Sequence, residues 1–513
     1  MAIASLKNDL KIKDVYELAS ILAGLKRDNK KIVHCHGVFD LLHIGHIRYF
    51  EQARRMGDVL IVTVTPDRFV DKGPCRPAFP ENLRAEAIAS LSFVDFVAIN
   101  QWPTAEETLR LLRPHVYVKG SEFKNIASDM TGKIAREEKV IREIGAVLAF
   151  TEDIVFSSTN LINRYFSDFP AEIQEYLNVF RNRYRLEDIL QILDDMERLK
   201  VLIIGDTILD EYQYCQAIGT SSKDPALAIK YSAHDLFAGG VLAVSNHVAN
   251  FAGTVQVVTV LGERGSHEEF IRSQLHAKVS PRFFFQDGAP TTMKRRYIEG
   301  YSLNKLLEVY IMDDSGLNPA KEKELSDYLK KELSRYDLVI AADFGHGAIS
   351  NGTIRTLADC SRFLAVNTQA NAGNRGFNTI SRYPRSDYVS IADHEIRLEK
   401  RNANGPLRPI MHELIHKIGC RQLVVTRGRR GATISDSGGS FVDVPSFARN
   451  VIDRVGAGDA FFAVTSMAAV LGAPSEILGF IGNVVGSLAV EIVGNKKAID
   501  KMAVKKYITS LMK

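Results

Sequence analysis

The sequence predicts an α/β protein with two domains, each built on a parallel β-sheet. Two β-branched runs, at 31–40 and 200–210, each end in a glycine-containing turn, as at the start of a parallel-sheet unit. After each run, short apolar segments alternate with helical patterns, and parallel strands require such helical crossovers. The length of 513 residues leaves room for both units, since domains usually hold roughly 100–200 residues.

The expected strands divide into two series. They lie at 58–64, 93–99, 115–120 and 145–150 in the first half, and at 254–262, 336–345, 362–368, 387–391 and 421–428 in the second. A helix is expected at 46–57, ending in a C-cap glycine. Residues 167–200 are charged and helix-periodic, which predicts one or two connecting helices. We therefore place a first domain at 1–165, a helical linker at 166–199 and a second domain at 200–513.

Composition narrows the class of protein. The net charge of +4 is small for this length, so we expect neither a nucleic-acid nor a membrane partner. The five cysteines form no CxxC pair and are odd in number, which favours a reducing cytoplasm over a disulfide framework. The N-terminal residues lack an apolar core of signal-peptide length. The apolar run at 460–473 is shorter than the ~18–20 residues of a bilayer span and predicts a buried helix.

Four histidines lie in the segment HCHGVFDLLHIGH at 34–46. A zinc site is one interpretation, but His34 and His36 alternate along a strand and are better interpreted as strand residues without chemistry. His43 and His46 flank a glycine that lets the backbone approach a ligand closely. The helix that follows has free N–H groups at its start, which bind anions. Two imidazoles at this place predict phosphate chemistry, because they can donate hydrogen bonds where charge develops during transfer.

The segment GVFDLLHIGH resembles the HxGH signature of cytidylyltransferase-like nucleotidyltransferases. KGPCRP (72–77), YVKGSEF (117–123) and FSSTNLI (156–162) resemble further motifs of that family, in its order, over residues 31–165. The resemblance implies His43 and His46 as catalytic residues, and a nucleotide and phosphate site made of Gly37, Phe39, Lys72, Arg76, Lys119, Gly120, Ser157, Ser158 and Thr159. Asp40 is expected to order the loop. The arginine that often follows SST is missing, since Asn160–Asn163 stand there.

A second motif, DRVGAGDAFFA, occupies 453–463. Glycines at a helix start turn backbone N–H groups inward and form an anion hole. Asp459 stands in the first turn, where it could take a proton from a substrate hydroxyl. The alternative is an N-terminal capping aspartate without chemistry, and GAGD alone does not decide between the two.

The motif is accompanied by LIIGDTILDEY (202–212) and by segments at 237–253, 393–398 and 424–432. In this order they resemble the ribokinase-like (PfkB) sugar kinases over about 184–513. The resemblance implies Asp459 as the catalytic base, Gly456, Ala457 and Gly458 as the anion hole, Asp210, Gly239 and Gly240 at the sugar, Glu395 as an indirect Mg²⁺ ligand, and Thr426, Gly428 and Asn483 at ATP. It also implies a small β lid, at 213–232 and 291–310, through which the chain forms a homodimer.

Two family asparagines are missing. Ala243 stands where an asparagine holds the sugar, and Ala392 replaces the asparagine of the NxxE motif. Asn367, Thr368 and Gln369 stand where the family has Asp-Pro-Lys. These changes predict an altered sugar or a weakened kinase.

Together the halves resemble the bifunctional ADP-heptose synthases, in reversed order. The resemblance implies a Rossmann-like HxGH nucleotidyltransferase domain followed by a ribokinase-like α/β domain with a small β lid. The expected function is a sugar-phosphate kinase and sugar-1-phosphate nucleotidyltransferase that uses Mg²⁺ and ATP, with ATP or CTP as nucleotidyl donor. Its product would be a nucleotide-activated, heptose-like sugar for a polysaccharide or glycoconjugate. The alternative is a working transferase beside a degenerate kinase half that binds nucleotide or dimerises.

Overall fold

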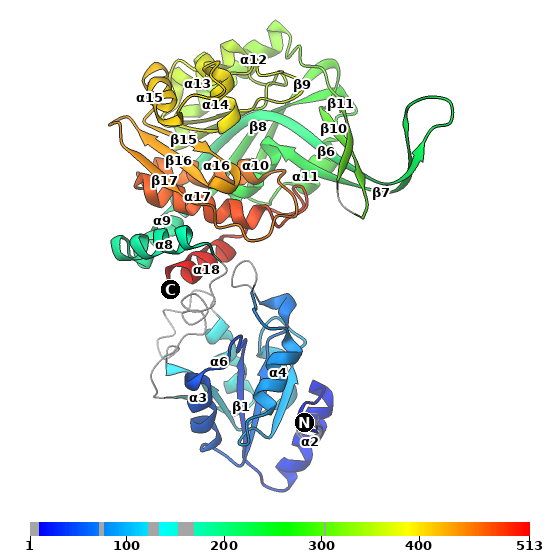
Figure 1. Ribbon diagram of the computed structural model, residues 1–513, viewed down its shortest axis with the longest axis vertical. Coiled ribbons are helices and arrows are strands. Elements are labelled where there is room, and N and C mark those ends of the chain that lie inside the picture. The colour runs from blue at the N-terminus through cyan, green and yellow to red at the C-terminus, as the bar shows by residue number, and fades with distance from the viewer. Residues whose placement is uncertain (1–9, 71–75, 122–132, 152–168, 302–303) are drawn as a thin grey trace. The chain divides into compact units, whose positions relative to one another are not determined.

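The computed structural model describes residues 10–70, 76–121, 133–151, 169–301 and 304–513 (Figure 1). The chain divides into two compact units. Unit 1 comprises Met1–Asp168 and Thr509–Lys513, and unit 2 comprises Phe169–Ile508. Lys72, Ser157, Ser158 and Thr159 of the predicted nucleotide site lie outside the described residues.

In the described part of unit 1, five parallel strands form one sheet in the order β3-β2-β1-β4-β5. The strands are β1 (Ile32–Gly37), β2 (Val59–Val64), β3 (Phe96–Ile99), β4 (Val116–Lys119) and β5 (Val147–Phe150). All five were predicted from the apolar runs. Because every strand runs the same way, their carboxyl ends share one edge, where sheets of this kind bind ligands.

Helices cover both faces of this sheet. They are α2 (Val15–Arg27), α3 (Ile44–Arg54), α4 (Glu81–Ala89), α5 (Glu106–Leu112) and α6 (Lys133–Glu143), with a 3₁₀ turn η1 (Asp67–Phe69). Val33 packs with Phe50 of α3 on one side, and Ile32 packs with Leu18 of α2 on the other. Gly57 was predicted to cap the helix at its C-terminus, but this prediction is wrong, because α3 already ends at Arg54. A Cβ on Gly57 would lie 2.6 Å from Val33 Cγ2, so glycine is needed there for close packing.

Unit 2 is built on a larger sheet whose central strands run in the order β9-β8-β6-β12-β13-β14-β15-β16-β17. They are β9 (Val279–Pro290), β8 (Thr254–Arg264), β6 (Lys200–Thr220), β12 (Leu338–Asp343), β13 (Leu364–Thr368), β14 (Tyr388–Ala392), β15 (Gln422–Thr426), β16 (Ala432–Asp436) and β17 (Phe441–Val444). The strands from β9 to β15 are parallel, and β16 and β17 are antiparallel. The sequence did not predict β9, β16 and β17.

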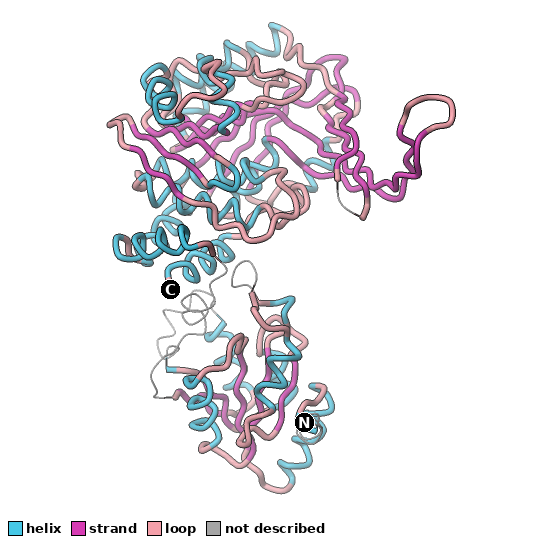
Figure 2. The backbone as a smooth tube through the Cα atoms, viewed as in Figure 1, coloured by secondary structure: helices cyan, strands magenta, loops and turns pink. Residues whose placement is uncertain are grey.

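Strands occupy the two segments expected to form a small β lid. β6 continues far beyond residue 210 and pairs antiparallel with β7 (Leu227–Gly240), and Figure 2 shows this long hairpin projecting from unit 2. On its other side, the distal part of β6 pairs in parallel with β10 (Met293–Glu299), which pairs with β11 (Lys305–Ile311). The register places Lys294 opposite Asp210.

Two groups of helices enclose the central sheet of unit 2 (Figure 1). The first group holds α12 (Pro319–Glu332), α13 (Asn351–Cys360), α14 (Asp393–Glu399) and α15 (Leu407–Lys417). The second holds α10 (Val241–Ala249), α16 (Ala457–Val470) and α17 (Ser475–Ala489). Unit 2 also contains α11 (Glu268–Gln274) and the part of α18 (Lys501–Met512) up to Ile508. Residues 460–469 of α16 are all buried, as predicted for this run. Within the described ranges, we find no helix whose length and apolar character would let it cross a membrane.

The expected connecting helices are α8 (Ala171–Arg183) and α9 (Leu186–Asp195). Both belong to unit 2, and α8 packs on α17. The Phe180 and Phe480 rings stack with centroids 4.3 Å apart, and Glu476 accepts hydrogen bonds from Arg183 and from the Tyr184 hydroxyl.

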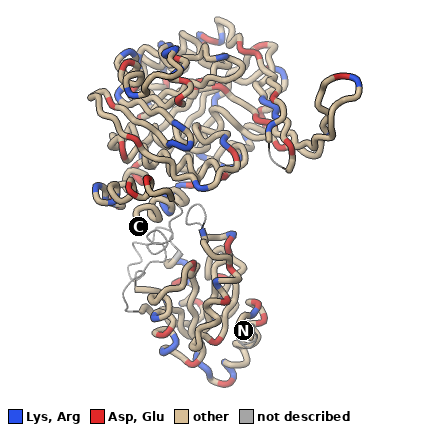
Figure 3. Tube along the Cα trace, viewed as in Figure 1, with Lys and Arg blue, Asp and Glu red and all other residues tan. Residues whose placement is uncertain are grey.

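Acidic and basic residues are interspersed along each unit, in line with the small net charge (Figure 3).

Candidate active sites

His43 and His46 lie at the start of α3, at the carboxyl edge of the unit 1 sheet. His43 is the N-cap residue, and its Nδ1 accepts a hydrogen bond of 3.1 Å from the Gly45 N–H. The two rings are stacked, with centroids 3.9 Å apart. Burial lowers the pKa of His43, so its ring is neutral near pH 7. Because Nδ1 accepts, the neutral ring carries its proton on Nε2, which is the atom able to donate to a ligand.

Gly37 and Phe39 support the histidine pair. Phe39 has a φ of +50° and meets His46 edge-on, with ring centroids 5.4 Å apart. A Cβ on Gly37 would lie 2.9 Å from the Phe39 ring. A larger residue at position 37 would displace Phe39 and with it the His46 ring. Gly37 and Phe39 therefore lie together beside the histidine pair.

His34 and His36 share one strand face, as expected, and both bond to the Thr63 hydroxyl. The distances are 2.7 Å from His34 Nε2 and 2.8 Å from His36 Nδ1. Burial, with a smaller effect of Lys119, lowers the pKa of His34 to about 3. In the described ranges, no three His, Cys, Asp or Glu side chains gather as metal ligands would. The geometry thus favours the interpretation of this pair as strand residues.

Asp40 orders the loop that follows position 75. Its carboxylate accepts hydrogen bonds from the backbone N–H of Ala78 (2.7 Å) and Phe79 (3.2 Å), and pairs with Arg76 at 3.2 Å. Both members of the ion pair are buried. Arg76, predicted to bind phosphate, is therefore engaged with Asp40 in this structure.

Arg84 is an organising residue that the sequence analysis missed. It is buried and donates hydrogen bonds to the carbonyl oxygens of Val38, Thr65 and Phe79. It thereby ties together the loops after β1 and β2. A single arginine in the sequence carries no local signal of such a role.

Lys119 ends β4 and forms a buried ion pair of 2.8 Å with Glu137 of α6. Gly120 follows at the same sheet edge. Lys119, which was predicted to bind phosphate, therefore already has a carboxylate partner. A phosphate that binds here would share the Lys119 ammonium group with Glu137.

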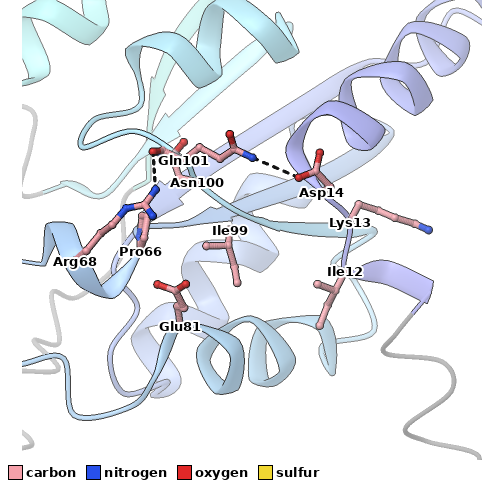
Figure 4. Close-up of a pocket in the computed structure, with 9 residues that line it drawn as sticks. All are labelled: Ile12, Lys13, Asp14, Pro66, Arg68, Glu81, Ile99, Asn100 and Gln101. Atoms are coloured by element: carbon pink, nitrogen blue, oxygen red, sulfur yellow. Dashed lines mark hydrogen bonds between the residues drawn. The ribbon is translucent and has the colours of Figure 1, made fainter.

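An open pocket of about 580 Å³ lies at the ends of β2 and β3 (Figure 4). Its lining residues are Ile12, Lys13, Asp14, Pro66, Arg68, Glu81, Ile99, Asn100 and Gln101. Two contacts close parts of its rim, from Arg68 to the Gln101 carbonyl and from the Gln101 amide to Asp14. None of the predicted site residues lines it.

In unit 2, Gly456 begins the buried helix α16. Its φ of +80° favours glycine, and a Cβ there would lie 2.2 Å from Asn495 Oδ1. Asp459 stands in the first turn of the helix. Burial raises the pKa of Asp459 to about 7; the charges of Asp210 and Glu395 add to the shift, and Lys294 opposes it. A carboxylate whose pKa lies near the working pH is suited to accept a proton from a hydroxyl group.

Asp210 lies close to Asp459, and its carboxylate is held from several sides. Arg296 of the lid donates to Oδ1, and the Asn495 amide reaches Oδ2 at 3.4 Å. A Cβ on Gly239 would lie 2.1 Å from Oδ2, so glycine is required beside it. The structure thus places Asp210 and Gly239, both predicted to contact the sugar, beside each other.

Lys294 was not singled out by the sequence analysis, although it is almost fully buried in this site. Burial lowers its pKa, while Asp210 acts in the opposite direction. Its neighbour on the same face of β10 is Arg296. The site therefore contains two cations from the lid next to the two carboxylates of Asp210 and Asp459.

The remaining predicted kinase residues lie in the helix α14, at the carboxyl end of β15 and in the helix α17. Glu395 accepts hydrogen bonds from Ala392 N–H (2.6 Å) and Ala370 N–H (3.0 Å), and burial raises its pKa. Thr426 ends β15, and Gly428 follows it with a φ of +57°. Asn483 is buried and donates to the Gly479 and Val444 carbonyl oxygens, so it fastens α17 to β17.

The sequence also holds one HExxH pattern, at 412–416 in α15. His412 and His416 are exposed, with ring centroids 4.5 Å apart, and Glu413 pairs with Lys400. Among the described residues, no third ligand joins them, so the pattern does not form a zinc-hydrolase site here.

A family model for pfkB family carbohydrate kinases matches residues 198–502, more than half of the chain. The chain belongs to the pfkB family of carbohydrate kinases. Unlike a kinase domain alone, this family member also carries a region, residues 34–164, that matches the Cytidylyltransferase-like model. The two matches confirm the expected order, with the transferase-like region first.

Both curated proteins and a solved structure are similar to parts of the chain. The chain is 38% identical over 156 residues to the bifunctional protein HldE of Aliarcobacter butzleri, and 36% identical over 155 residues to that of Desulfatibacillum aliphaticivorans. Each match covers 30% of this pfkB family member and 30% of the relative, so less than a third of either relative is matched. Escherichia coli phosphofructokinase-2 has the fold of unit 2, with a TM-score of 0.50 and 16% identity over 61% of this chain and 99% of that chain.

Proposed function

We propose that the chain is a bifunctional sugar-phosphate kinase and sugar-1-phosphate nucleotidyltransferase that makes a nucleotide-activated, heptose-like sugar. The observation that carries the kinase assignment is Asp459, whose pKa is raised to about 7 at the glycine-led start of α16. The stacked His43–His46 pair carries the transferase assignment. We place the transferase domain at 1–165, the linker at 166–199 and the kinase domain at 200–513.

In the kinase reaction, Asp459 takes the proton of a sugar hydroxyl as its oxygen attacks the γ-phosphorus of ATP. The bond between that phosphorus and the β,γ-bridging oxygen breaks, and ADP leaves. The N–H groups of Gly456, Ala457 and Gly458 stabilise charge on the transferred group. Thr426, Gly428 and Asn483 line the nucleotide.

The lid cations favour a phosphorylated sugar as the acceptor. Asp210 accepts hydrogen bonds from sugar hydroxyls beside Gly239 and Gly240, while Arg296 fixes its orientation. Lys294 adds a buried positive charge with no carboxylate ion pair among the described residues. Phosphate on the substrate would give this ammonium group a direct ionic partner.

Mg²⁺ fits this site through water rather than through a protein cage. Glu395 is the carboxylate we assign to it, and both of its oxygens already accept backbone N–H groups. When bound, the ion neutralises charge on the ATP phosphates. The remaining ligands would come from phosphate oxygens and water, because magnesium usually retains several waters.

In the transferase reaction, an oxygen of the sugar 1-phosphate attacks the α-phosphorus of ATP or CTP, and pyrophosphate leaves. His43, through Nε2–H, and His46 stabilise the charge that develops on the phosphate oxygens. Gly37 and Phe39 shape the site, and Lys119, Gly120, Lys72, Arg76 and the 157–159 segment are the proposed phosphate and nucleotide contacts. Positioning and charge stabilisation account for most of the catalysis.

We further propose a homodimer formed through the lid of unit 2. Ile218 on β6 and Leu227 and Tyr231 on β7 are 55–63% exposed, which is unusual for large apolar side chains on one hairpin. A second copy would cover them.

We assign the enzyme to the cytoplasm, where ATP and sugar phosphates are available.

One observation favours the alternative of a degenerate kinase half. Ala243 is 3% exposed at the start of α10 and offers no polar atom to a sugar, and Ala392 likewise lacks an amide. The decisive experiment incubates the full chain with ATP and a panel of sugar phosphates and measures ADP. A parallel assay with sugar 1-phosphates and each nucleoside triphosphate measures pyrophosphate. Pyrophosphate without any sugar-dependent ADP would support the alternative.

A further inference from the structure

His346 lies in the loop between β12 and α13 and is buried, with 5% of its surface exposed. Neither of its ring nitrogens has a hydrogen-bond partner among the residues that the structure describes. Buried polar atoms in folded proteins are nearly always paired, and leaving one unpaired costs free energy. Two unpaired nitrogens on one ring therefore point to a ligand that completes them.

The backbone of this loop is held rigidly by two buried carboxylates. Asp206 accepts hydrogen bonds from the N–H groups of Phe344 (2.8 Å) and Ala348 (2.9 Å). Asp343 accepts one from the Gly345 N–H at 3.1 Å. The loop that carries the imidazole is thus fixed on both sides of it.

Two further features fix the loop. Gly345 and Gly347, on either side of His346, have φ values of +70° and +96°, which favour glycine. The side-chain amides of Asn371 and Asn374 donate to the Phe344 carbonyl oxygen at 2.8 and 3.0 Å. This is a preorganised support of the kind that binding sites require.

The loop belongs to the kinase site. β12 pairs in parallel with β6, so the end of β12 lies at the sheet edge from which β6 continues to Asp210. Lys294 is within electrostatic reach of both His346 and Asp459, because its charge contributes to the pKa shift of each. The unpaired imidazole, the buried ammonium group and the proposed base therefore share one neighbourhood.

The protonation state selects the kind of ligand group. Burial, with a smaller effect of Lys294, lowers the pKa of His346 to about 3, so the ring is neutral at physiological pH. A neutral imidazole offers one donor and one acceptor, and so does a hydroxyl group. A phosphate would be held better by the neighbouring Lys294.

We propose that His346 hydrogen-bonds a hydroxyl group of the sugar substrate in the kinase site and helps to determine which sugar is phosphorylated. This inference rests on the kinase function proposed above. It also accounts for Ala243, because the loop after β12 then supplies the polar group that α10 does not offer to the sugar.

The test compares the full-length wild type with His346→Phe and His346→Gln. Phenylalanine keeps the ring but removes both nitrogens, and glutamine restores one donor and one acceptor. The acceptor is whichever of heptose 7-phosphate, fructose 6-phosphate and mannose 6-phosphate the wild type phosphorylates fastest. We expect His346→Phe to raise the KM for this sugar roughly tenfold or more, with the KM for ATP and the melting temperature unchanged, and His346→Gln to recover part of the loss.

His247→Asn is the matched control. His247 is also buried, but its Nδ1 accepts the Ile499 N–H at 3.0 Å, so it has a structural partner. This variant should lower the melting temperature and leave the sugar KM unchanged. The contrast separates a substrate contact from a packing role.

Each outcome is decisive. If the wild type is active and His346→Phe keeps its sugar KM within twofold, the inference is overturned while the kinase proposal stands. If the wild type phosphorylates no sugar, calorimetric titration with the same three sugars replaces KM. Weakened binding by His346→Phe then supports the contact although the kinase activity fails, and absence of binding by the wild type overturns both.

Discussion

The imidazole rings of His43 and His46 are stacked, with centroids 3.9 Å apart, at the first turn of α3. Phe39 meets the second ring edge-on, and the Gly45 N–H fixes the tautomer of the first. The two donors are therefore positioned before substrate binds, which is the condition under which they stabilise a transition state most effectively.

His46→Ala should reduce nucleotidyl transfer by about 10²–10³ without unfolding the chain, because it removes one such donor. Pyrophosphate release from a sugar 1-phosphate is the measurement. His36→Asn is the control, since His36 bonds to Thr63 and has no proposed role in transfer. Near-normal pyrophosphate release by His46→Ala would refute the assignment. If purified wild-type protein contains stoichiometric zinc and the variant does not, a metal site is favoured instead.

The pH dependence of the kinase should report Asp459. Only the deprotonated carboxylate accepts the proton, so kcat/KM should fall tenfold per pH unit below about 7 and level off above it. Lys294 opposes the upward shift, and Lys294→Met should therefore move the inflection to higher pH. A wild-type profile that stays flat down to pH 5 would show that Asp459 does not act as the base.

Gly239→Ala should damage the sugar site, because the new Cβ would lie 2.1 Å from Asp210 Oδ2. We expect the KM for the sugar phosphate to rise at least tenfold, by displacement of that carboxylate. Gly486→Ala in α17 is the matched control, since its Cβ meets nothing within 4 Å. That control should keep its KM and gain about 0.5–1 kcal/mol of unfolding free energy. Equal kinetics for both variants would exclude the proposed role of Asp210.

The lid should mediate dimerisation. The double variant Ile218→Asp with Leu227→Asp places charges on the exposed apolar part of the hairpin and should yield a monomeric mass in light scattering at micromolar concentration. Val179→Asp, on an exposed apolar residue of α8, should leave the dimer intact. A monomeric wild type, or a dimer that survives the lid charges, would contradict the proposal.

The strands of the central sheets could be predicted because each is a short apolar run followed by a turn and a helical pattern. β9 could not, since Pro281, Arg282 and Gln286 interrupt its apolar pattern, and β16 and β17 are short antiparallel additions. Their formation depends on pairing with strands already in place. Local sequence carries little information about such pairing.

The predicted site was incomplete for a similar reason. Asp210, Gly239 and Asp459 stand in motifs, whereas the importance of Lys294 and Arg296 arises from the pairing of β10 with a distant part of β6. The ion pair of Lys119 with Glu137 depends likewise on how α6 packs on β4. The clamped loop around His346 requires two buried carboxylates from different strands, which no single motif reveals.

The central claim is that one chain carries two independent transfer sites, and the most direct test is to measure both activities on wild type, Asp459→Asn and His46→Ala. The neutral amide of Asp459→Asn keeps the shape but cannot accept the hydroxyl proton. The account predicts that this variant loses sugar-dependent ADP formation and keeps pyrophosphate release, and that His46→Ala shows the reverse. Loss of both activities in either variant, or persistence of ADP formation in Asp459→Asn, would contradict it.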